Sequence, residues 1–440
     1  MNIFFKFKLD TKLKKSLMLG IIGVIFTIFG LSLLMNVIIK IESKVGLIIG
    51  FIALGIGFIF LSVKNLFNHA KQGRNLSDLG LVNKIYDKNI LSRGIKVVVI
   101  GGGTGLSVLL RGIKKFTSNI TAIVTVADDG GGSGKLREDL GMLPPGDIRN
   151  CILALADTEP IMEKLLQYRF KEGTLKNQSF GNLLIAAMVG ISDSFEHAIK
   201  RINQILAVAG KVLPVTTEDI TLYAKLKNGQ IIKGESQIPL KALENNSSIE
   251  KVFIKPKNVK PLEESIKAIK DADVIILGPG SLYTSIIPNL LVNDITKFIR
   301  KSSALKIYVS NLMTQPGETD NFTVGEHVKA ILNHAGKNVI QYVYANNESI
   351  PNEIIEKYRE EGAEPVELAQ KDMEFFSKNK INVIENNYIE IKKGYLRHNA
   401  FQLSKDIVNL VIEKKYSHDK IRFLELNSIV KKVKNTANSL

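Results

Sequence analysis

A glycine-rich segment at residues 101–106, GGGTGL, has the composition of a loop that binds phosphate groups. It follows the apolar run KVVVI at residues 96–100 and precedes an apolar pattern typical of a helix. Glycine lets the backbone approach a ligand closely and adopt positive φ angles, and the N-terminus of a helix directs unpaired N–H groups at an anion. A plain tight turn is the alternative, because the segment has neither the GxGxxG pattern nor the GK[ST] ending of known nucleotide loops.

Paired carboxylates stand in a second glycine-rich segment, ADDGGGSG at residues 127–134. Asp128 and Asp129 could hold a divalent cation or accept hydrogen bonds from sugar hydroxyls, although Asp-Gly clusters also form ordinary turns and helix caps. Farther along, Arg149 could bind a phosphate through two parallel hydrogen bonds, or could form a structural ion pair with Asp147. The residue types alone leave both alternatives open.

Two more segments place glycine, hydroxyl and amide groups after apolar runs. They are GPGSLYTS at residues 278–285 and SNLMTQPGETD at residues 310–320. Open α/β sheets bind ligands at the carboxyl ends of their strands, so we expect all four segments to meet there around a phosphate-bearing ligand. The ligand-binding residues expected from type and position are Gly101, Gly102, Gly103, Thr104, Gly105, Leu106, Asp128, Asp129, Gly130, Ser133, Asp147, Arg149, Asn150, Gly278, Gly280, Ser281, Thr284 and Asn311.

The sequence lacks the residues that disulfides, metal sites and serine nucleophiles require. The single cysteine, Cys151, excludes an intramolecular disulfide and thiolate zinc sites, and we expect it to pack on a helix. The six histidines show no metal-ligand spacing, and we expect His327 and His334 on the surface. No GxSxG nucleophile motif is present. Catalytic residues therefore stay unassigned, with Asp128 and Asp129 as the candidates.

The elements that must position these residues follow the pattern of an α/β fold. The apolar, β-branched runs are typical of strands buried on both faces of a parallel sheet. Amphipathic stretches between them predict helices. Asn228-Gly229 is typical of a β-hairpin turn and indicates a small β-rich insertion at about residues 213–255. The strands are expected at residues 96–100, 120–126, 273–277 and 306–310, the helices at 160–170, 182–189 and 194–208, and a second hairpin at 387–399.

The basic residues gather at the two ends of the chain. The net charge is +16 over 440 residues, but residues 96–412 are nearly balanced. The sequence has no tryptophan and no basic stripe with interleaved aromatic residues. We therefore expect no nucleic-acid partner.

Two uncharged stretches, residues 17–39 and 45–63, each have about the 20 residues that cross a membrane as a helix. Lysines flank the pair on its outer sides, which by the positive-inside rule predicts cytoplasmic ends and a short external loop. We therefore expect two transmembrane helices, with the main domain on the cytoplasmic side of the cell membrane. The expected domains are a hairpin and connector at 1–94, an α/β domain at 95–412 and a basic tail at 413–440.

Residues 96–400 closely resemble the gluconeogenesis factor family, also called YvcK-type, within the CofD-like superfamily. The matching segments are GGGTGLSVLLRGIK, TAIVTVADDGGGSGKLR, MLPPGDIRNC, SFGNLLIAA, LGPGSLYTSIIPNLLV and NLMTQPGETD. The resemblance implies a Rossmann-like three-layer sandwich, with a mostly parallel sheet and the ligand at the strand ends.

The resemblance also implies roles for individual residues. The loop at residues 101–106 would line a diphosphate, with Asp128, Asp129, Gly280 and Ser281 nearby. Asn182 of SFGN and Arg397 of LRHN would complete the pocket. The chain departs from the family pattern at Asn399, where Asp is usual, at Ala400, where some relatives carry a hydroxyl, and at Asn177-Gln178, where Gly-His is common.

Two functions follow from the resemblance. The first is a membrane-anchored regulatory protein that binds a UDP-sugar, such as UDP-N-acetylglucosamine or UDP-glucose, and serves cell morphogenesis and wall synthesis during gluconeogenic growth. Its expected partners include cell-wall synthesis proteins and further copies of itself, and it requires no cofactor. The second is a CofD-like transferase that moves a phospho-group of the 2-phospholactate type from a nucleotide diphosphate, with Mg²⁺ held at Asp128 or Asp129. We favour the binding protein, because the sequence supplies no clear general base.

Overall fold

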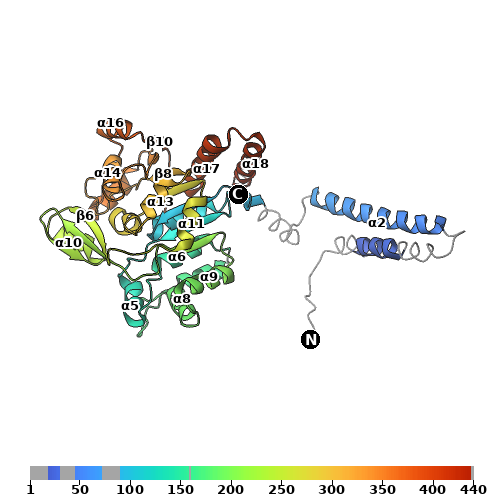
Figure 1. Ribbon diagram of the computed structural model, residues 1–440, viewed down its shortest axis with the longest axis horizontal. Helices are drawn as coiled ribbons and strands as arrows, with labels where there is room; N and C mark the ends of the chain where they lie inside the picture. The colour runs from blue at the N-terminus through green and yellow to red at the C-terminus, as the bar shows by residue number, and fades with distance from the viewer. Residues whose placement is uncertain (1–17, 30–44, 72–89, 158–159, 438–440) are drawn as a thin grey trace. The chain divides into compact units, whose positions relative to one another are not determined.

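The computed structural model describes residues 18–29, 45–71, 90–157 and 160–437 (Figure 1). The chain divides into two compact units, Met1–Asn89 and Ile90–Leu440. The strands of the α/β sheet and all the predicted site residues belong to the second unit.

In the first unit, a helix at residues 18–29 packs against α2, Val45–Lys71. The two backbones meet at Gly23 and Gly55, where a Cβ on either glycine would lie 2.9 Å from the carbonyl oxygen of the other. The rings of Phe26 and Phe58 stack with centroids 6.3 Å apart. Small residues at this contact therefore set the close approach of the two helices.

The predicted membrane hairpin is contradicted. In the part of the chain that the structure describes, no helix is both long and apolar enough to cross a membrane. Residues 30–44, which include the predicted external loop, lie outside the described residues. The two predicted transmembrane helices and the predicted cell-membrane localisation are therefore wrong.

A seven-stranded parallel sheet forms the centre of the second unit, in the order β10-β9-β8-β7-β1-β2-β3. The four central strands are apolar and almost wholly buried, as the sequence predicts for strands covered on both faces. The α/β fold with a parallel sheet is thus confirmed. The strands are β1 Val97–Gly101, β2 Ile120–Val124, β3 Lys211–Pro214, β7 Val274–Leu277, β8 Leu305–Val309, β9 Tyr342–Asn346 and β10 Asn382–Asn386.

The chain reverses its direction of travel across the sheet between β1 and β7. It proceeds from β1 through β2 to β3 on one side, and then returns to β7, which pairs with β1 on the other side. The loops after these two neighbouring strands therefore lead away from each other. Such a switch point opens a crevice at the carboxyl ends of the strands.

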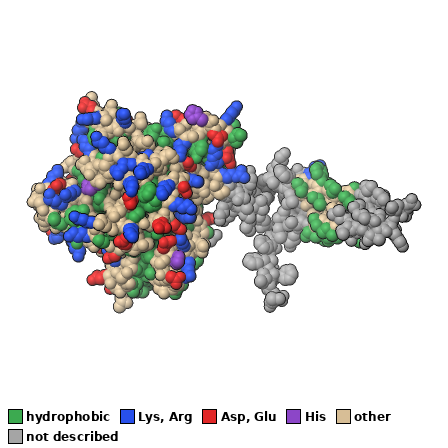
Figure 2. All heavy atoms as spheres, viewed as in Figure 1, with side chains coloured by type: hydrophobic (Ala, Val, Ile, Leu, Met, Phe, Trp, Pro, Cys, Tyr) green, Lys and Arg blue, Asp and Glu red, His purple; other side chains and the backbone are tan. Residues whose placement is uncertain are grey.

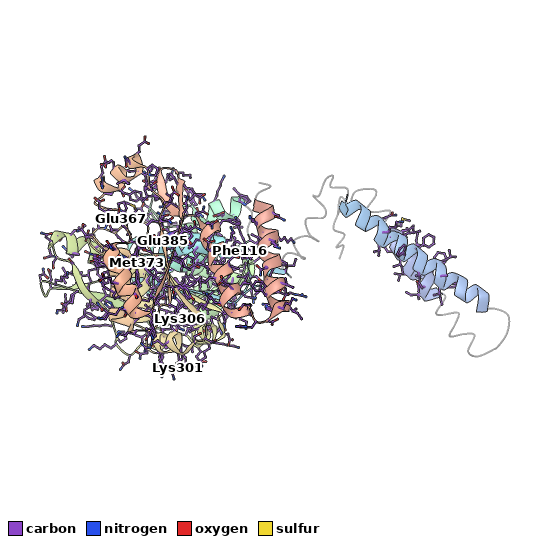
Figure 3. The ribbon with its side chains drawn as sticks, turned by 90° about the horizontal axis from the view of Figure 1, so that it is seen from above. Phe116, Lys301, Lys306, Glu367, Met373 and Glu385 are labelled. Carbon is purple, nitrogen blue, oxygen red and sulfur yellow. The ribbon has the colours of Figure 1, made fainter. Side chains whose placement is uncertain are left out.

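Helices form two groups around this sheet. In one group α4 contacts α6 and α17, and in the other α11 contacts α13 while α12 contacts α14. The ring of Phe116, labelled in Figure 3, packs 5.6 Å from the ring of Phe401 in α17. Cys151 is buried on α6, as expected. The helices are α4 Gly103–Ile113, α5 Gly131–Leu140, α6 Gly146–Leu155, α7 Pro160–Gln167, α8 Phe180–Gly190, α9 Phe195–Ile205, α11 Glu263–Asp271, η1 Leu282–Ile286 (a π-helix), α12 Ile287–Leu290, α13 Ile295–Lys301, α14 Val324–Ala335, α15 Asn352–Glu360, α16 Gln370–Asn379, α17 Ala400–Tyr416 and α18 Lys420–Ala437.

The β-rich insertion is a lobe beside the main sheet (Figure 1). It consists of the antiparallel strands β4 Thr221–Leu226, β5 Ile231–Lys233 and β6 Ile249–Lys255, with α10 Gln237–Glu244. Gly229 in the β4–β5 turn has φ +90°, a conformation that suits glycine. Residues 211–214, which include the start predicted for the insertion, belong instead to the edge strand β3 of the main sheet.

The predicted second hairpin is confirmed as β11 Ile389–Lys392 paired with β12 Tyr395–His398. The surface position expected for His327 is wrong, and His334 is half-buried rather than exposed. His327 is fully buried, and the Nε2 atom of His334 accepts a hydrogen bond from the N–H of Val252 at 3.0 Å. On the face seen in Figure 2, basic and acidic side chains are interspersed over the second unit.

Candidate functional site

A cavity of about 350 Å³ lies at the switch point between β1 and β7. Its walls come from the loops after β1, β7 and β8, from α15 and the turn that follows it, and from β12. This position is where an open parallel sheet collects a ligand. Six predicted residues line the cavity: Thr104, Gly105, Gly280, Ser281, Asn311 and Arg397.

The first glycine loop contacts both the cavity and the half-buried carboxylate of Asp147. The N–H of Gly103 donates to the carboxylate of Asp147, and a Cβ on Gly102 would collide with that carboxylate. Thr104 and Gly105, one step farther into α4, line the cavity. The first turn of α4 therefore holds an internal anion at Gly103 and presents its next residues to a ligand.

Asp147 does not line the cavity. Burial, and then the nearby Asp128, raises the pKa of Asp147 to about 7, while the Gly103 N–H and Arg149 oppose the rise. Near neutral pH this carboxyl group therefore exists in both protonation states beside the glycine loop.

Asp128 and Asp129 face inward and hold the second loop together. The N–H of Gly130 donates to Asp128 at 2.9 Å, and burial raises the pKa of Asp128. Asp129 accepts the N–H groups of Glu235 and Ser236, at 3.1 and 2.9 Å. Neither carboxylate lines the cavity. Asp129 thus anchors the insertion to the second glycine loop.

Glu235 is a residue that sequence reasoning missed. Its pKa is raised to about 8 by burial and then by the charges of Asp128, Glu318, Asp147 and Asp129. It lies in a loop that shows no motif, 106 residues after the Asp129 that its N–H contacts. The β5–α10 turn brings this one further acidic group close to Asp128, Asp129 and Asp147, and no local sequence pattern predicts it.

Arg149 is buried inside a polar cluster. It donates to the side-chain oxygens of Asn182 at 2.7 Å and Asn150 at 2.9 Å, and it also contacts Ser179. Ser179 in turn caps α8 by accepting the N–H of Asn182. Burial lowers the pKa of Arg149 to about 10. This arginine fixes the start of α8 rather than lining the cavity.

The loop after β7 is held by a buried glutamate, Glu318. Glu318 accepts the N–H of Tyr283 at 3.1 Å, the hydroxyl of Thr284 at 2.9 Å and the amide of Gln315 at 2.7 Å. Thr284 therefore points to Glu318, whereas Ser281 and Gln315 line the cavity. Burial raises the pKa of Glu318 to about 7.

The segment LRHN completes the cavity, with one task for each polar residue. Arg397 lines the cavity and lies with its guanidinium 5.6 Å from the centre of the Tyr395 ring. Burial lowers the pKa of His398 to about 4, so the neutral ring donates from Nε2 to the carbonyl of Ser310 at 3.0 Å. Asn399 caps α17 by accepting the N–H of Gln402.

The structure thus separates the predicted residues into two sets. One set lines the cavity, and the other forms the hydrogen-bonded supports behind it. The loops after β7 and β8 lie at the cavity as the segments 278–285 and 310–320 predict. Sequence reasoning missed the cavity residues contributed by α15 and its following turn, because helix α15 shows no ligand motif. The predicted residues outside the lining are Gly101, Gly102, Gly103, Leu106, Asp128, Asp129, Gly130, Ser133, Asp147, Arg149, Asn150, Asn182, Gly278 and Thr284. Further lining residues within the two predicted segments are Pro279, Leu312, Met313, Thr314, Gln315 and Pro316, and those outside them are Val108, Tyr358, Glu361, Ala363, Leu396 and His398.

Comparisons with known proteins agree with one another. Residues 97–389 match the family model of "2-phospho-L-lactate transferase CofD". A "Putative gluconeogenesis factor" of Clostridium acetobutylicum is 51% identical over 422 residues, which cover 94% of this chain and 93% of that protein. The "Gluconeogenesis factor" of Bacillus subtilis is 46% identical over 319 residues, covering 72% of this chain and 98% of the relative. A crystal structure of a UPF0052 family member from Bacillus halodurans superposes with TM-score 0.68 at 45% identity, covering 71% of this chain and 99% of that one.

Proposed function

Since the chain belongs to the gluconeogenesis factor family and carries a CofD-like domain, we propose that its cavity binds a UDP-sugar, such as UDP-N-acetylglucosamine or UDP-glucose. We further propose that the bound ligand makes the protein a regulator of cell morphogenesis and wall synthesis during gluconeogenic growth.

The observation that carries the proposal is the composition of the cavity wall. Backbone and hydroxyl donors of Thr104, Gly105, Gly280 and Ser281 meet at the switch point, and Arg397 faces the same space. A diphosphate accepts hydrogen bonds from such donors, and a guanidinium binds phosphate oxygens through charge-assisted pairs. The volume of about 350 Å³ lies in the range of small-molecule sites.

The surroundings of the carboxylates favour binding over catalysis. Asp128 and Asp129, the two candidate catalytic residues, do not line the cavity. Both oxygens of Asp129 accept backbone N–H groups of the insertion. A carboxylate occupied in this way supports the loop and is not presented to a substrate.

The alternative is a CofD-like transfer of a phospho-group from a nucleotide diphosphate to an acceptor hydroxyl, with release of the nucleoside monophosphate. The match of residues 97–389 to the CofD family model supports this alternative. Asp147, with a pKa of about 7, lies beside Gly103 but outside the cavity lining, so it would take up the proton of that hydroxyl through an intervening water. The described residues offer no group of three or more His, Cys, Asp or Glu side chains arranged to hold a metal ion. A single carboxylate, Asp128, would suffice if Mg²⁺ came with the diphosphate, because Mg²⁺ takes few protein ligands beside phosphates.

Titration calorimetry of the full chain with UDP-N-acetylglucosamine tests the binding proposal. Arg397→Ala should weaken binding at least tenfold, because it removes a cation that faces the diphosphate. Lys392→Ala, an exposed lysine of the same hairpin, should change the affinity less than twofold. Absence of heat and of a melting shift at millimolar ligand would refute UDP-sugar binding. Release of nucleoside monophosphate from nucleotide diphosphate donors and Mg²⁺, lost in Asp147→Asn, would establish the transferase instead.

A further inference from the structure

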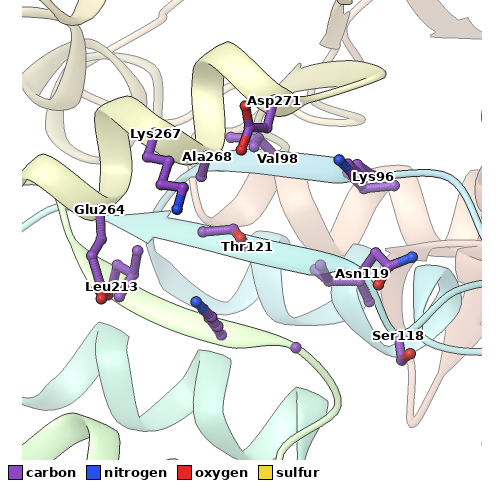
Figure 4. Close-up of a pocket in the computed structure, with 14 residues that line it drawn as sticks. Lys96, Val98, Ser118, Asn119, Thr121, Leu213, Glu264, Lys267, Ala268 and Asp271 are labelled. Atoms are coloured by element: carbon purple, nitrogen blue, oxygen red, sulfur yellow. The ribbon is translucent and has the colours of Figure 1, made fainter. Parts of the chain in front are cut away.

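A second cavity, of about 360 Å³, lies at the amino ends of the strands, opposite to the cavity at their carboxyl ends. Figure 4 shows its lining residues. Its floor consists of the amino ends of β1, β2 and β3, and α11 covers it. The five residues of β1 span roughly 17 Å at about 3.4 Å each, so this cavity is separate from the one at the switch point. None of its lining residues belongs to the cavity already described.

Three lysines from three different elements line this second cavity. Lys96 precedes β1, Lys211 begins β3, and Lys267 extends from α11 toward Thr121 of β2 (Figure 4). In the described part of the chain their ammonium groups form neither a hydrogen bond nor an ion pair. Three cations without counter-ions around one hollow favour an anionic ligand.

The acidic groups nearby do not balance these cations. Asp273 binds Lys415 and the N–H of Lys96, at 3.0 and 2.8 Å. Glu264 lines the cavity and binds Lys200 through Oε1 at 2.9 Å. The remaining carboxylate in the lining, Asp271, is exposed, as the three lysines are. Three lysines thus face two carboxylates, a surplus of one positive charge, or of two when Glu264 is counted with Lys200. The lining therefore keeps a positive surplus.

The second oxygen of Glu264 gives independent information about the ligand. Oε2 is buried and has no hydrogen-bond partner. The side chain as a whole keeps 35% of its surface exposed, so a small turn of the carboxylate brings Oε2 to the cavity. There it accepts a hydrogen bond from a water or from a ligand hydroxyl. The hydroxyl of Thr121, which also lines the cavity, can act as donor or acceptor.

We propose that this cavity binds a small anion that also carries hydroxyl groups, of the class of phosphorylated polyols. The anion lies among Lys96, Lys211 and Lys267, and a ligand hydroxyl donates to Glu264 Oε2. The site does not depend on the function proposed for the other cavity, because the two share no residue.

Ligand-observed NMR on the full chain tests the site, with glycerol 3-phosphate as the probe and sulfate at equal ionic strength as the comparison. Glycerol 3-phosphate should bind at least fivefold more tightly than sulfate, because only it supplies hydroxyls. The double variant Lys211→Met with Lys267→Met should weaken binding of glycerol 3-phosphate at least tenfold. Lys257→Met, an exposed lysine outside the lining, should change it less than twofold.

Glu264→Gln separates the two parts of the proposal. Loss of the acceptor should weaken the binding of glycerol 3-phosphate at least threefold. The binding of sulfate should stay the same or become tighter, because a negative charge is removed. Equal affinities for the two probes would show attraction by net charge alone and overturn the proposal. Binding that is lost in Arg397→Ala but kept in the double lysine variant would place the probe in the other cavity. That result would also overturn the proposal.

Discussion

Gly105 lies where the first glycine loop touches the loop after β7. A Cβ on this residue would stand 2.8 Å from the carbonyl oxygen and 3.1 Å from the carbonyl carbon of Pro279. Both atoms belong to the backbone, so neither can turn aside as a flexible side chain would. The two loops can approach this closely, and form one wall of the cavity, because residue 105 has no side chain.

Gly105→Ala should therefore force the two loops apart. We expect a destabilisation of about 1 to 3 kcal/mol, as for other overpacked sites, and at least a tenfold loss of affinity for UDP-N-acetylglucosamine. Urea unfolding and titration calorimetry measure the two effects. Gly190→Ala is the matched control, because a Cβ there meets nothing within 4 Å. Equal behaviour of the two variants would contradict the proposed contact.

At the residue scale, the sequence identifies glycine and hydroxyl positions better than it identifies charged ones. Gly105 and Ser281 follow strands and line the cavity as predicted from their place in the chain. The roles of Asp129 and Arg149 depend on partners far along the chain, the N–H of Glu235 and the amide oxygen of Asn182. A charged side chain takes whichever partner the tertiary structure supplies, and no local spacing encodes that choice.

At the scale of elements, Glu318 connects the loop after β7 to the loop after β8. Its two oxygens accept three donors, from Tyr283, Thr284 and Gln315. Ser281 and Gln315, which line the cavity, are neighbours of these contacts in the chain or take part in them. The relative position of the two loops therefore depends on one buried carboxylate.

Glu318→Gln should disturb this connection in either orientation of the new amide. One orientation places the NH₂ group against the N–H of Tyr283, and the other places it against the amide of Gln315. We expect a loss of about 1 to 3 kcal/mol in the free energy of unfolding, the cost of an unsatisfied buried donor, and at least a fivefold loss of ligand affinity. Glu374→Gln, exposed on α16, controls for the change of charge. A variant with lower stability but unchanged affinity would show that Glu318 does not position the ligand-binding loops.

The four central strands could be predicted because burial on both faces leaves one composition, short runs of apolar and β-branched residues. The outer strands lack this apolar, β-branched composition. β10, Asn382–Asn386, is at the sheet edge and half exposed, so its sequence NVIEN resembles a loop. The range predicted for the insertion, about 213–255, includes the last two residues of β3, Lys211–Pro214, because the two are adjacent in sequence. Only the pairing with β2 shows that β3 belongs to the main sheet.

At the scale of the whole molecule, three carboxyl groups with little contact to solvent influence one another, the buried Glu318 and the half-buried Asp147 and Glu235. Glu235 has a pKa of about 8, and Asp147 and Glu318 have pKa values of about 7. Burial is the largest cause for each of them, and the charges of the neighbouring carboxyl groups add to it. The folded protein therefore retains protons that the unfolded chain, with pKa values near 4, has already released.

Stability should fall as the pH rises from 6 to 8. In this range the folded state binds more protons than the unfolded state, so the free energy of unfolding decreases with pH. At about 1.4 kcal/mol for each pKa unit, the three groups together should lower it by roughly 2 to 5 kcal/mol. Below about pH 6.5 the buried His398, whose pKa is lowered to about 4, acts in the opposite direction. Urea unfolding at several pH values measures the slope.

Glu235→Gln tests the group with the largest single share of this slope. A neutral amide of the same size cannot ionise, so the variant should be more stable than the parent at pH 8 and should differ little from it at pH 5. Its slope between pH 6 and 8 should be about half that of the parent, because Asp147 and Glu318 still titrate and have lost one neighbouring charge. Glu374→Gln should leave the slope unchanged. A parent protein whose stability is constant or rises between pH 6 and 8 would show that these carboxyl groups are already ionised in the fold, with cations or solvent that compensate their burial.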